Sequence, residues 1–132
     1  MTDWSQKTAL VTGGSRGIGA AMVAMLADLG CHVMTCGRGD RPDDLPDAAT
    51  WVTADVSDEN DIQRLATHVK NAGGKLDILV NNAGVQVEKT VAESSNEDWD
   101  MVMGINAKAV FVLCRQFIPI MASSGGGSII NI

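Results

Sequence analysis

The chain has 132 residues, of which 45% are hydrophobic and 20% are charged. This length and composition are typical of one soluble globular domain and exclude a second folded unit. Ten basic and sixteen acidic residues give a formal net charge of -6, so we expect neither nucleic acid nor an anionic membrane surface among its partners.

The amino terminus has no basic cluster followed by an apolar run, and we expect no later stretch to reach the roughly 18 apolar residues of a membrane span. The lack of a signal-like amino terminus and the expected lack of a membrane span both favour a cytoplasmic protein. The three cysteines, Cys31, Cys36 and Cys114, lack the spacing of metal ligands and are expected to be small buried residues. The sequence contains no tyrosine.

Short β-branched runs alternate with longer helical patterns, which predicts a parallel sheet with crossover helices. We expect strands at residues 8–12, 32–36, 51–54, 76–80 and 128–132. A helix that ends at Gly30 follows the first strand. Its predicted buried face comprises Ile18, Met22, Met25, Leu26 and Leu29. Residues 37–47 are rich in glycine, proline and aspartate, and are expected to form an exposed loop.

Two further helices are predicted. Ser57 is the expected N-cap of the first, whose apolar stripe is Ile62, Leu65, Ala66 and Val69 and which ends at residues 73–74. Ser95 and Asp98 resemble a capping box that opens a long helix, from about residue 96 to residue 121 and continuous up to Pro119. Because residues 101–117 are apolar on more than one face, we expect this helix to be buried twice, with a partner subunit as the candidate for the second contact.

A glycine-rich turn connects the first strand to the first helix, with the sequence Thr12-Gly13-Gly14-Ser15-Arg16-Gly17-Ile18-Gly19. Glycines permit a sharp turn, close approach of the backbone to a pyrophosphate, and tight packing of helix on strand. The helix N-terminus adds free N–H groups and a partial positive charge. The alternative is a turn that binds nothing, but a strand before it and a helix after it favour dinucleotide binding.

The pattern Thr12-Gly13-x-x-x-Gly17-x-Gly19 does not stand alone. Asp55-Val56 follows the third strand, Asn81-Asn82-Ala83-Gly84 follows the fourth, and Asn106 lies in the long helix. With these motifs in this order, the chain resembles the short-chain dehydrogenase/reductase family, in the size class of the 3-oxoacyl-acyl-carrier-protein reductases. The resemblance implies an α/β fold with a Rossmann-type doubly wound parallel sheet. Residues 1–132 would form one NAD(P)-binding domain that is incomplete at its C-terminus, after the fifth strand.

The resemblance also implies roles for individual residues. Around the cofactor phosphates and adenosine ribose it places Gly13, Ser15, Arg16, Gly17 and Ile18, with Gly19 in the same motif. Asp55 and Val56 would contact the adenine, Asn82, Ala83 and Gly84 would line the floor near the riboses, and Asn81 would be structural. From the residues alone, Asp55 could instead cap the next turn, and the two asparagines could hold neighbouring strands together.

The end of the second strand discriminates between NAD and NADP in this family, because a carboxylate there holds the ribose hydroxyls and an arginine holds a 2'-phosphate. Gly37 occupies that position and Arg38 follows it, while Arg16 offers a second cation. NADP is therefore favoured over NAD. Two alternatives stay open: the acids in Asp40-Arg41-Pro42-Asp43-Asp44 could fold over the same pocket, and Arg38 could be a surface residue.

In the family, a tyrosine assisted by a lysine transfers the proton, a serine positions the substrate carbonyl, and an asparagine holds the water that relays protons. Only the asparagine, Asn106, is present. Three interpretations remain: the N-terminal part of an NAD(P)-dependent oxidoreductase that interconverts a secondary alcohol and a carbonyl, a nucleotide-binding module without catalysis, or a subunit completed by another chain. We expect the isolated chain to be inactive and poorly soluble, and the complete protein to be a homodimer or homotetramer.

Overall fold

The computed structural model describes all 132 residues. All five predicted strands are present, and their ends differ from the prediction by at most two residues. The elements in chain order are η1 (Trp4–Gln6), β1 (Thr8–Thr12), α1 (Gly17–Asp28), β2 (His32–Gly37), β3 (Thr50–Thr53), α2 (Glu59–Asn71), β4 (Ile78–Asn81), η2 (Val91–Glu93), α3 (Asn96–Met103), the π-helical segment η3 (Gly104–Lys108), α4 (Ala109–Ser123) and β5 (Ser128–Asn131).

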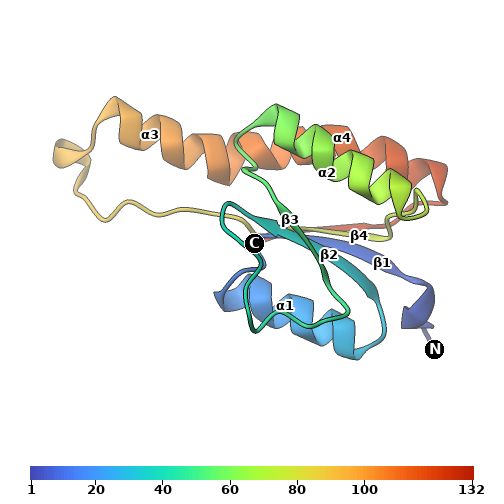
Figure 1. Cartoon of the computed structure of the whole chain (residues 1–132). Helices are drawn as coiled ribbons and strands as arrows, with labels where there is room; N and C mark the ends of the chain where they lie inside the picture. The colour runs from blue at the N-terminus through green and yellow to red at the C-terminus, as the bar shows by residue number, and fades with distance from the viewer.

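The strands form one parallel sheet in the order β3-β2-β1-β4-β5. The chain builds the sheet outward from β1 to one edge and then returns to build the other, which is the doubly wound arrangement. Helix α1 covers one face, whereas α2 and α4 cover the opposite face (Figure 1). The predicted fold class is confirmed.

Alternating residues of β1 divide the core into two layers, because successive side chains of a strand point to opposite faces. Leu10 belongs to the larger buried cluster, which also contains residues of α2 and α4. Ala9 and Val11 belong to the smaller cluster, together with residues of α1. The central strand is thus buried on both faces, which explains its continuous apolar sequence.

The predicted buried face of α1 is partly wrong. Val23 and Leu26 are its buried apolar residues, whereas Ile18, Met25 and Leu29 are exposed. Apolar residues surround this short helix on most sides, so spacing alone does not identify the face that meets the sheet. The predicted end is correct, because Gly30 has a left-handed φ of 88° directly after the helix and its N–H bonds to the Ala27 carbonyl.

The apolar stripe predicted for α2 is confirmed, since Ile62, Leu65, Ala66 and Val69 are all buried. The predicted N-cap is wrong by one residue. Asp58 caps the helix by accepting a hydrogen bond from the Asn60 N–H, whereas the Ser57 hydroxyl bonds to Asp55. A carboxylate at this position also interacts favourably with the helix dipole.

The long helix is not a continuous α-helix, because η3 interrupts it with a π-helical turn between α3 and α4. The Ser95–Asp98 capping box is present. The helix continues through Pro119 and ends at Ser123, two residues beyond the predicted end at residue 121. Burial of Phe117 and Met121 on the sheet offsets the missing hydrogen bond of the proline.

The expectation that no segment is long and apolar enough for a membrane span is also wrong. The helical run Asn96–Ser123 contains an 18-residue window with a mean hydropathy of 1.4, and 28% of that window is buried inside the protein. By length and composition only, this run could cross a membrane. In the fold, its inner face packs on the sheet through Val112, Leu113 and Phe117, as the core helix of a globular domain does.

Of the three cysteines, Cys31 and Cys36 are buried as expected, whereas Cys114 is only half-buried. None of the three forms a disulfide.

Candidate functional site

A cavity of about 330 Å³ opens at the carboxyl ends of the central strands. Every predicted cofactor residue except Gly19 lines it. The lining comprises Gly13, Ser15, Arg16, Gly17, Ile18, Cys36, Gly37, Arg38, Ala54, Asp55, Val56, Asn82, Ala83, Gly84, Val85 and Ile105. Most of these residues lie at the ends of β1, β2, β3 and β4 or in the segments that follow them, and Ile105 lies in η3. The parallel sheet thus gathers segments that are far apart in the sequence.

The glycine turn forms one wall of this cavity. The N–H groups of Gly13 and Gly14 donate to the Cys36 carbonyl at 3.0 and 3.3 Å, which ties the turn to the end of β2. Gly17 has a left-handed φ of 58°, and a Cβ placed there would find no atom within 4 Å. The backbone at Gly17 therefore faces open space and leaves room for a ligand to approach.

Gly19, in the same motif, packs against the glycine turn and Asn82. It is buried, and an added Cβ would lie 2.2 Å from the Gly13 carbonyl oxygen and 2.5 Å from Nδ2 of Asn82. A side chain would push α1 away from the turn, so this glycine permits close packing of helix on strand and does not line the cavity.

The N-terminus of α1 lacks a side-chain cap. Its N-cap residue, Arg16, makes no side-chain hydrogen bond to the first turn, whereas Asp58 and Ser95 cap α2 and α3. The first N–H groups of a helix have no partner within the helix itself. Those of α1 are thus available to an acceptor in the cavity, and the helix dipole favours an anionic one.

Asp55 lies in the cavity wall after β3, and one of its oxygens is already engaged. Oδ1 accepts hydrogen bonds from the Ser57 N–H at 2.9 Å and from the Ser57 hydroxyl at 2.6 Å. The carboxylate therefore does cap the next turn, and it also faces the cavity. Asp61 accepts the Asp55 N–H at 2.8 Å. This bond, followed by the hydrogen bond from Arg64, holds the pKa of Asp61 below its usual value.

Asn82 connects the ends of β1 and β4. Its Nδ2 donates to the carbonyls of Thr12 at 3.1 Å and Gly13 at 3.2 Å. In return, Oγ1 of the fully buried Thr12 accepts the N–H groups of Asn82 at 3.1 Å and Ala83 at 3.0 Å. The asparagine thus holds the glycine turn in place, and its residue lines the cavity as well.

Asn81 is buried, and it pairs with its register partner on β5. Its Nδ2 donates to Oδ1 of Asn131 at 2.8 Å, while its own Oδ1 has no hydrogen-bond partner. Both asparagines therefore hold neighbouring strands together, as one reading of the sequence expected.

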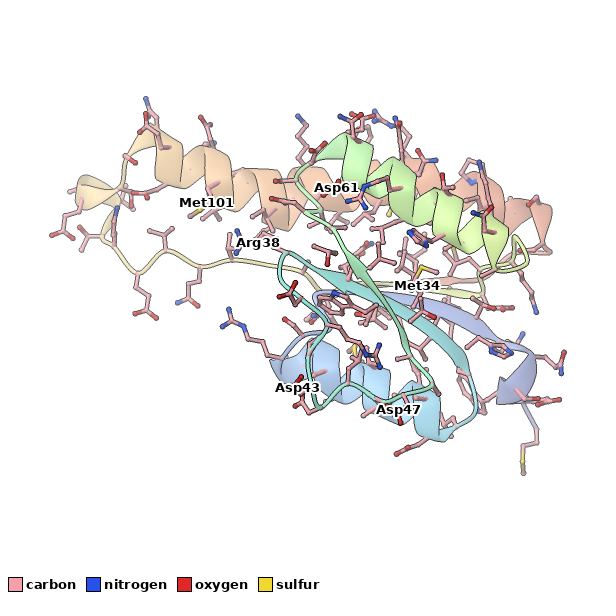
Figure 2. The ribbon with its side chains drawn as sticks, in the orientation of Figure 1. Met34, Arg38, Asp43, Asp47, Asp61 and Met101 are labelled. Atoms are coloured by element: carbon pink, nitrogen blue, oxygen red, sulfur yellow. The ribbon has the colours of Figure 1, made fainter.

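The end of β2 contributes two cavity residues, Gly37 and Arg38. The Arg38 side chain is exposed and forms no salt bridge. None of the acids Asp40, Asp43 and Asp44 lines the cavity. Figure 2 shows Asp43 and Asp47 beside α1, away from Arg38.

The cause lies within the loop, because the Arg41 guanidinium donates to the carbonyls of Ala49 at 2.8 Å and Pro46 at 2.9 Å. Together with the burial of Leu45, these bonds anchor the loop against the α1 side of the sheet.

Asn106 lies in a second, adjoining cavity of about 550 Å³, which shares the residues from Asn82 to Val85 with the first. Its side chain bonds to the main chain of Val85 in both directions. Oδ1 accepts the Val85 N–H and Nδ2 donates to the Val85 carbonyl, both at 2.8 Å. The residue belongs to η3, and such π-helical turns occur frequently at functional sites.

Sequence reasoning missed four cavity residues, namely Cys36, Ala54, Val85 and Ile105. Ala54 and Val85 flank predicted motifs, so their positions beside Asp55 and Gly84 were the available signal. Cys36 and Ile105 look like core residues in the sequence and carry no such signal. Burial raises the pKa of the Cys36 thiol to about 11, so it remains a neutral part of the cavity floor.

Comparison with known proteins identifies the family. The family model described as short chain dehydrogenase matches residues 7–132. The chain belongs to this family. Its five-stranded parallel sheet is the Rossmann-type fold of this family.

Named relatives agree with this assignment. A tropinone reductase homolog of Datura stramonium is 38% identical over an alignment of 140 positions, which covers 96% of this chain and 52% of the relative. The 3-oxoacyl-[acyl-carrier-protein] reductase of Rickettsia bellii is 38% identical over an alignment of 137 positions, which covers 100% of this chain and 55% of the relative. The chain thus spans about half the length of the curated relatives that it matches.

A solved structure shows the same architecture. The 3-ketoacyl-(acyl-carrier-protein) reductase from Brucella melitensis, complexed with NADH, superimposes with a TM-score of 0.88 at 31% sequence identity. The match covers 96% of this chain and 56% of that protein.

Proposed function

We propose that this chain is the cofactor-binding part of an oxidoreductase that uses NADP in preference to NAD and interconverts a secondary alcohol and a carbonyl compound. The observation that carries the proposal is the 330 Å³ cavity, which unites the glycine turn, the uncapped helix and two arginines without acidic partners. In a chain with a net charge of -6, two free cations on one cavity favour an anionic ligand.

The adenosine end of the cofactor fits between the loops after β2 and β3. Asp55 has one carboxylate oxygen engaged by Ser57, which leaves the other as an acceptor for an adenine amino group. Val56 contributes an apolar surface beside it, and Ala54 is small enough to leave space for a ring. The pyrophosphate fits at the glycine turn, where Ser15, Arg16, Gly17 and the first N–H groups of α1 meet.

A preference for the 2'-phosphate form is supported by charge at the end of β2. Gly37 offers no carboxylate to repel the phosphate, and the Arg38 guanidinium matches phosphate geometry. Arg16 approaches from the glycine turn. Arg41 holds the acidic loop away through the Ala49 and Pro46 carbonyls, so the loop does not neutralise these cations.

The nicotinamide end fits in the second cavity. A bound nicotinamide cofactor supplies or accepts the hydride. Asn106 holds the wall between the two cavities through its paired bonds to Val85. A relay water would be held by the groups of Asn106 that remain free, which include a second Nδ2 proton and the second lone pair of Oδ1.

The proton donor must come from outside this sequence. Without a tyrosine among the 132 residues, the Tyr-x-x-x-Lys pair and the serine implied by the resemblance belong to another segment.

We further propose a homodimer or homotetramer in the cytoplasm. Exposed apolar side chains along the outer face of the long helix, including Met101, Phe111 and Ile118, support an association surface. Three cysteines without a disulfide suit a reducing compartment.

The test is the affinity for two fragments that differ only in the 2'-phosphate, 2',5'-ADP and 5'-AMP, measured by titration calorimetry. Arg38→Ala should weaken 2',5'-ADP binding roughly tenfold, because a charge-assisted hydrogen bond contributes about 1.5 kcal/mol, and leave 5'-AMP binding within about twofold. Arg115→Ala is the matched control, since Arg115 lies on α4 and pairs with Glu59 away from the cavity. The proposal fails if the unmodified protein binds neither fragment.

A further inference from the structure

Trp51 occupies the space in which a side chain at position 37 would lie. The two residues are on neighbouring strands, where Gly37 pairs with Thr53 in register. A Cβ built on Gly37 would stand 2.7 Å from Cη2 and 3.2 Å from Cζ2 of the Trp51 indole. Real Cβ atoms essentially never come as close as 2.7 Å to another heavy atom, so any larger residue requires the indole to move.

The backbone itself would accept a side chain at this position. Gly37 is not among the glycines with a positive φ, and it continues β2 as an ordinary strand residue. Glycine is therefore required here by the neighbouring ring and not by its own conformation.

The indole is held firmly in this position. Its Nε1 donates to Oγ1 of Thr53 at 3.3 Å, and that hydroxyl donates to the Gly39 carbonyl at 3.0 Å. The ring also packs against the buried cluster beneath α1. This chain of hydrogen bonds runs from β3 to the residue after Arg38, so the ring and the end of β2 are fixed relative to one another.

We infer that Trp51 is a specificity-determining residue, which acts through position 37 and not by contact with the cofactor. Its indole keeps the cavity wall beside Arg38 free of any side chain, and so free of a carboxylate that would hold ribose hydroxyls and repel a 2'-phosphate. The inference rests on the proposed function, because position 37 lines the cavity assigned to the adenosine ribose. Trp51 itself lies behind that wall.

The first test needs no ligand. Gly37→Ala adds only the Cβ, and against Trp51 it should lower the melting temperature by roughly 4–10 °C, as overpacking does. In the background of Trp51→Phe, whose ring is shorter, the same substitution should change the melting temperature by less than about 2 °C. Equal losses in the two backgrounds would overturn the inference. If Trp51→Phe does not melt cooperatively, Trp51→His takes its place, because it keeps a ring N–H.

The second test measures the ratio of the dissociation constants for 2',5'-ADP and 5'-AMP. The double variant Gly37→Asp with Trp51→Phe should shift this ratio at least about tenfold toward 5'-AMP, because the new carboxylate faces the 2'-phosphate. Trp51→Phe alone should leave the ratio within about threefold of the wild type. Gly37→Asp alone should lose affinity for both fragments, because the indole blocks the carboxylate.

The outcomes separate this inference from the proposed function. If the wild-type protein binds neither fragment, the proposed function is wrong. If it binds 2',5'-ADP, and Gly37→Asp alone keeps the wild-type melting temperature and shifts the ratio as far as the double variant, only the role of Trp51 is wrong.

Discussion

Thr12 provides the sharpest test of how the cavity floor is held. Its hydroxyl, which is fully buried, accepts two main-chain N–H groups, from Asn82 at 3.1 Å and Ala83 at 3.0 Å. Valine has nearly the same shape but no acceptor, so Thr12→Val leaves both donors without a partner. An unsatisfied donor costs about 1–3 kcal/mol, and because these two share one acceptor we expect a total loss of about 2–4 kcal/mol.

A loss of this size is a large part of the stability of a typical domain, about 5–15 kcal/mol. It should lower the melting temperature by roughly 8–16 °C, which scanning calorimetry measures directly. Binding of 2',5'-ADP should weaken as well, because residues 82–84 line the cavity.

The matched control is Thr12→Ser, which keeps the hydroxyl and removes only a buried methyl group, at a cost of about 1 kcal/mol. The reasoning is refuted if Thr12→Val is no more destabilising than Thr12→Ser. That result would mean that the two N–H groups find other partners when the hydroxyl is removed.

Two further predictions concern stability and association. Burial raises the pKa of Asp77, but hydrogen bonds from the Thr8 N–H, Lys7 and Lys75 outweigh it and hold the pKa below its ordinary value. The stabilisation is therefore present above about pH 4 and lost as the pH falls through the folded-state pKa. Asp77→Asn should lower the free energy of unfolding by about 1–3 kcal/mol at pH 7, measured by urea unfolding, and should reduce the further loss of stability below pH 4. If the variant loses as much stability below pH 4 as the wild type, this reasoning is contradicted. Two neighbouring residues of α4 should respond differently to an introduced charge. Val112→Asp buries a carboxylate at a site that is 5% exposed and should abolish cooperative melting. Phe111→Asp, at a site that is 62% exposed, should keep the fold and lower the apparent molecular mass in size-exclusion chromatography. An unchanged mass for Phe111→Asp would exclude that face from the subunit contact.

The periodicity of the sequence determined which segments form strands and which form helices along the chain, because each helix or strand must bury apolar residues at its own repeat. For α2 this information was complete: apolar residues at 62, 65, 66 and 69 lie on one face of an otherwise polar helix, and all four are buried. For α1 it was insufficient, because apolar side chains surround the helix and only the sheet selects Val23 and Leu26 as the buried pair.

The interruption of the long helix was not visible in the sequence either. Gly104 and Asn106 are weak helix formers, but helix propensity does not distinguish a π-helical turn from an α-helical one. The π-helical turn coincides with the bonds between Asn106 and Val85, a residue 21 positions away. Pro119 lies inside the helix, which was predicted to about residue 121, and packing of Ile120 and Met121 on the core maintains the helix as far as Ser123.

The candidate site was predictable where each motif acts next to its own strand. The glycine turn, Asp55 and Asn82 all follow a strand directly, and parallel strands bring their carboxyl ends to one edge. For this reason the sequence by itself determined the family resemblance and the edge of the sheet that holds the cavity. All but one of the residues predicted to bind the cofactor line that cavity. Only the tertiary structure decided that Arg41 holds the acidic loop away from Arg38 and that Trp51 excludes a side chain at position 37. The first depends on hydrogen bonds from Arg41 to carbonyls five and eight residues further along the same loop, and the second on the pairing of β2 with β3. The pattern of residue types records neither contact.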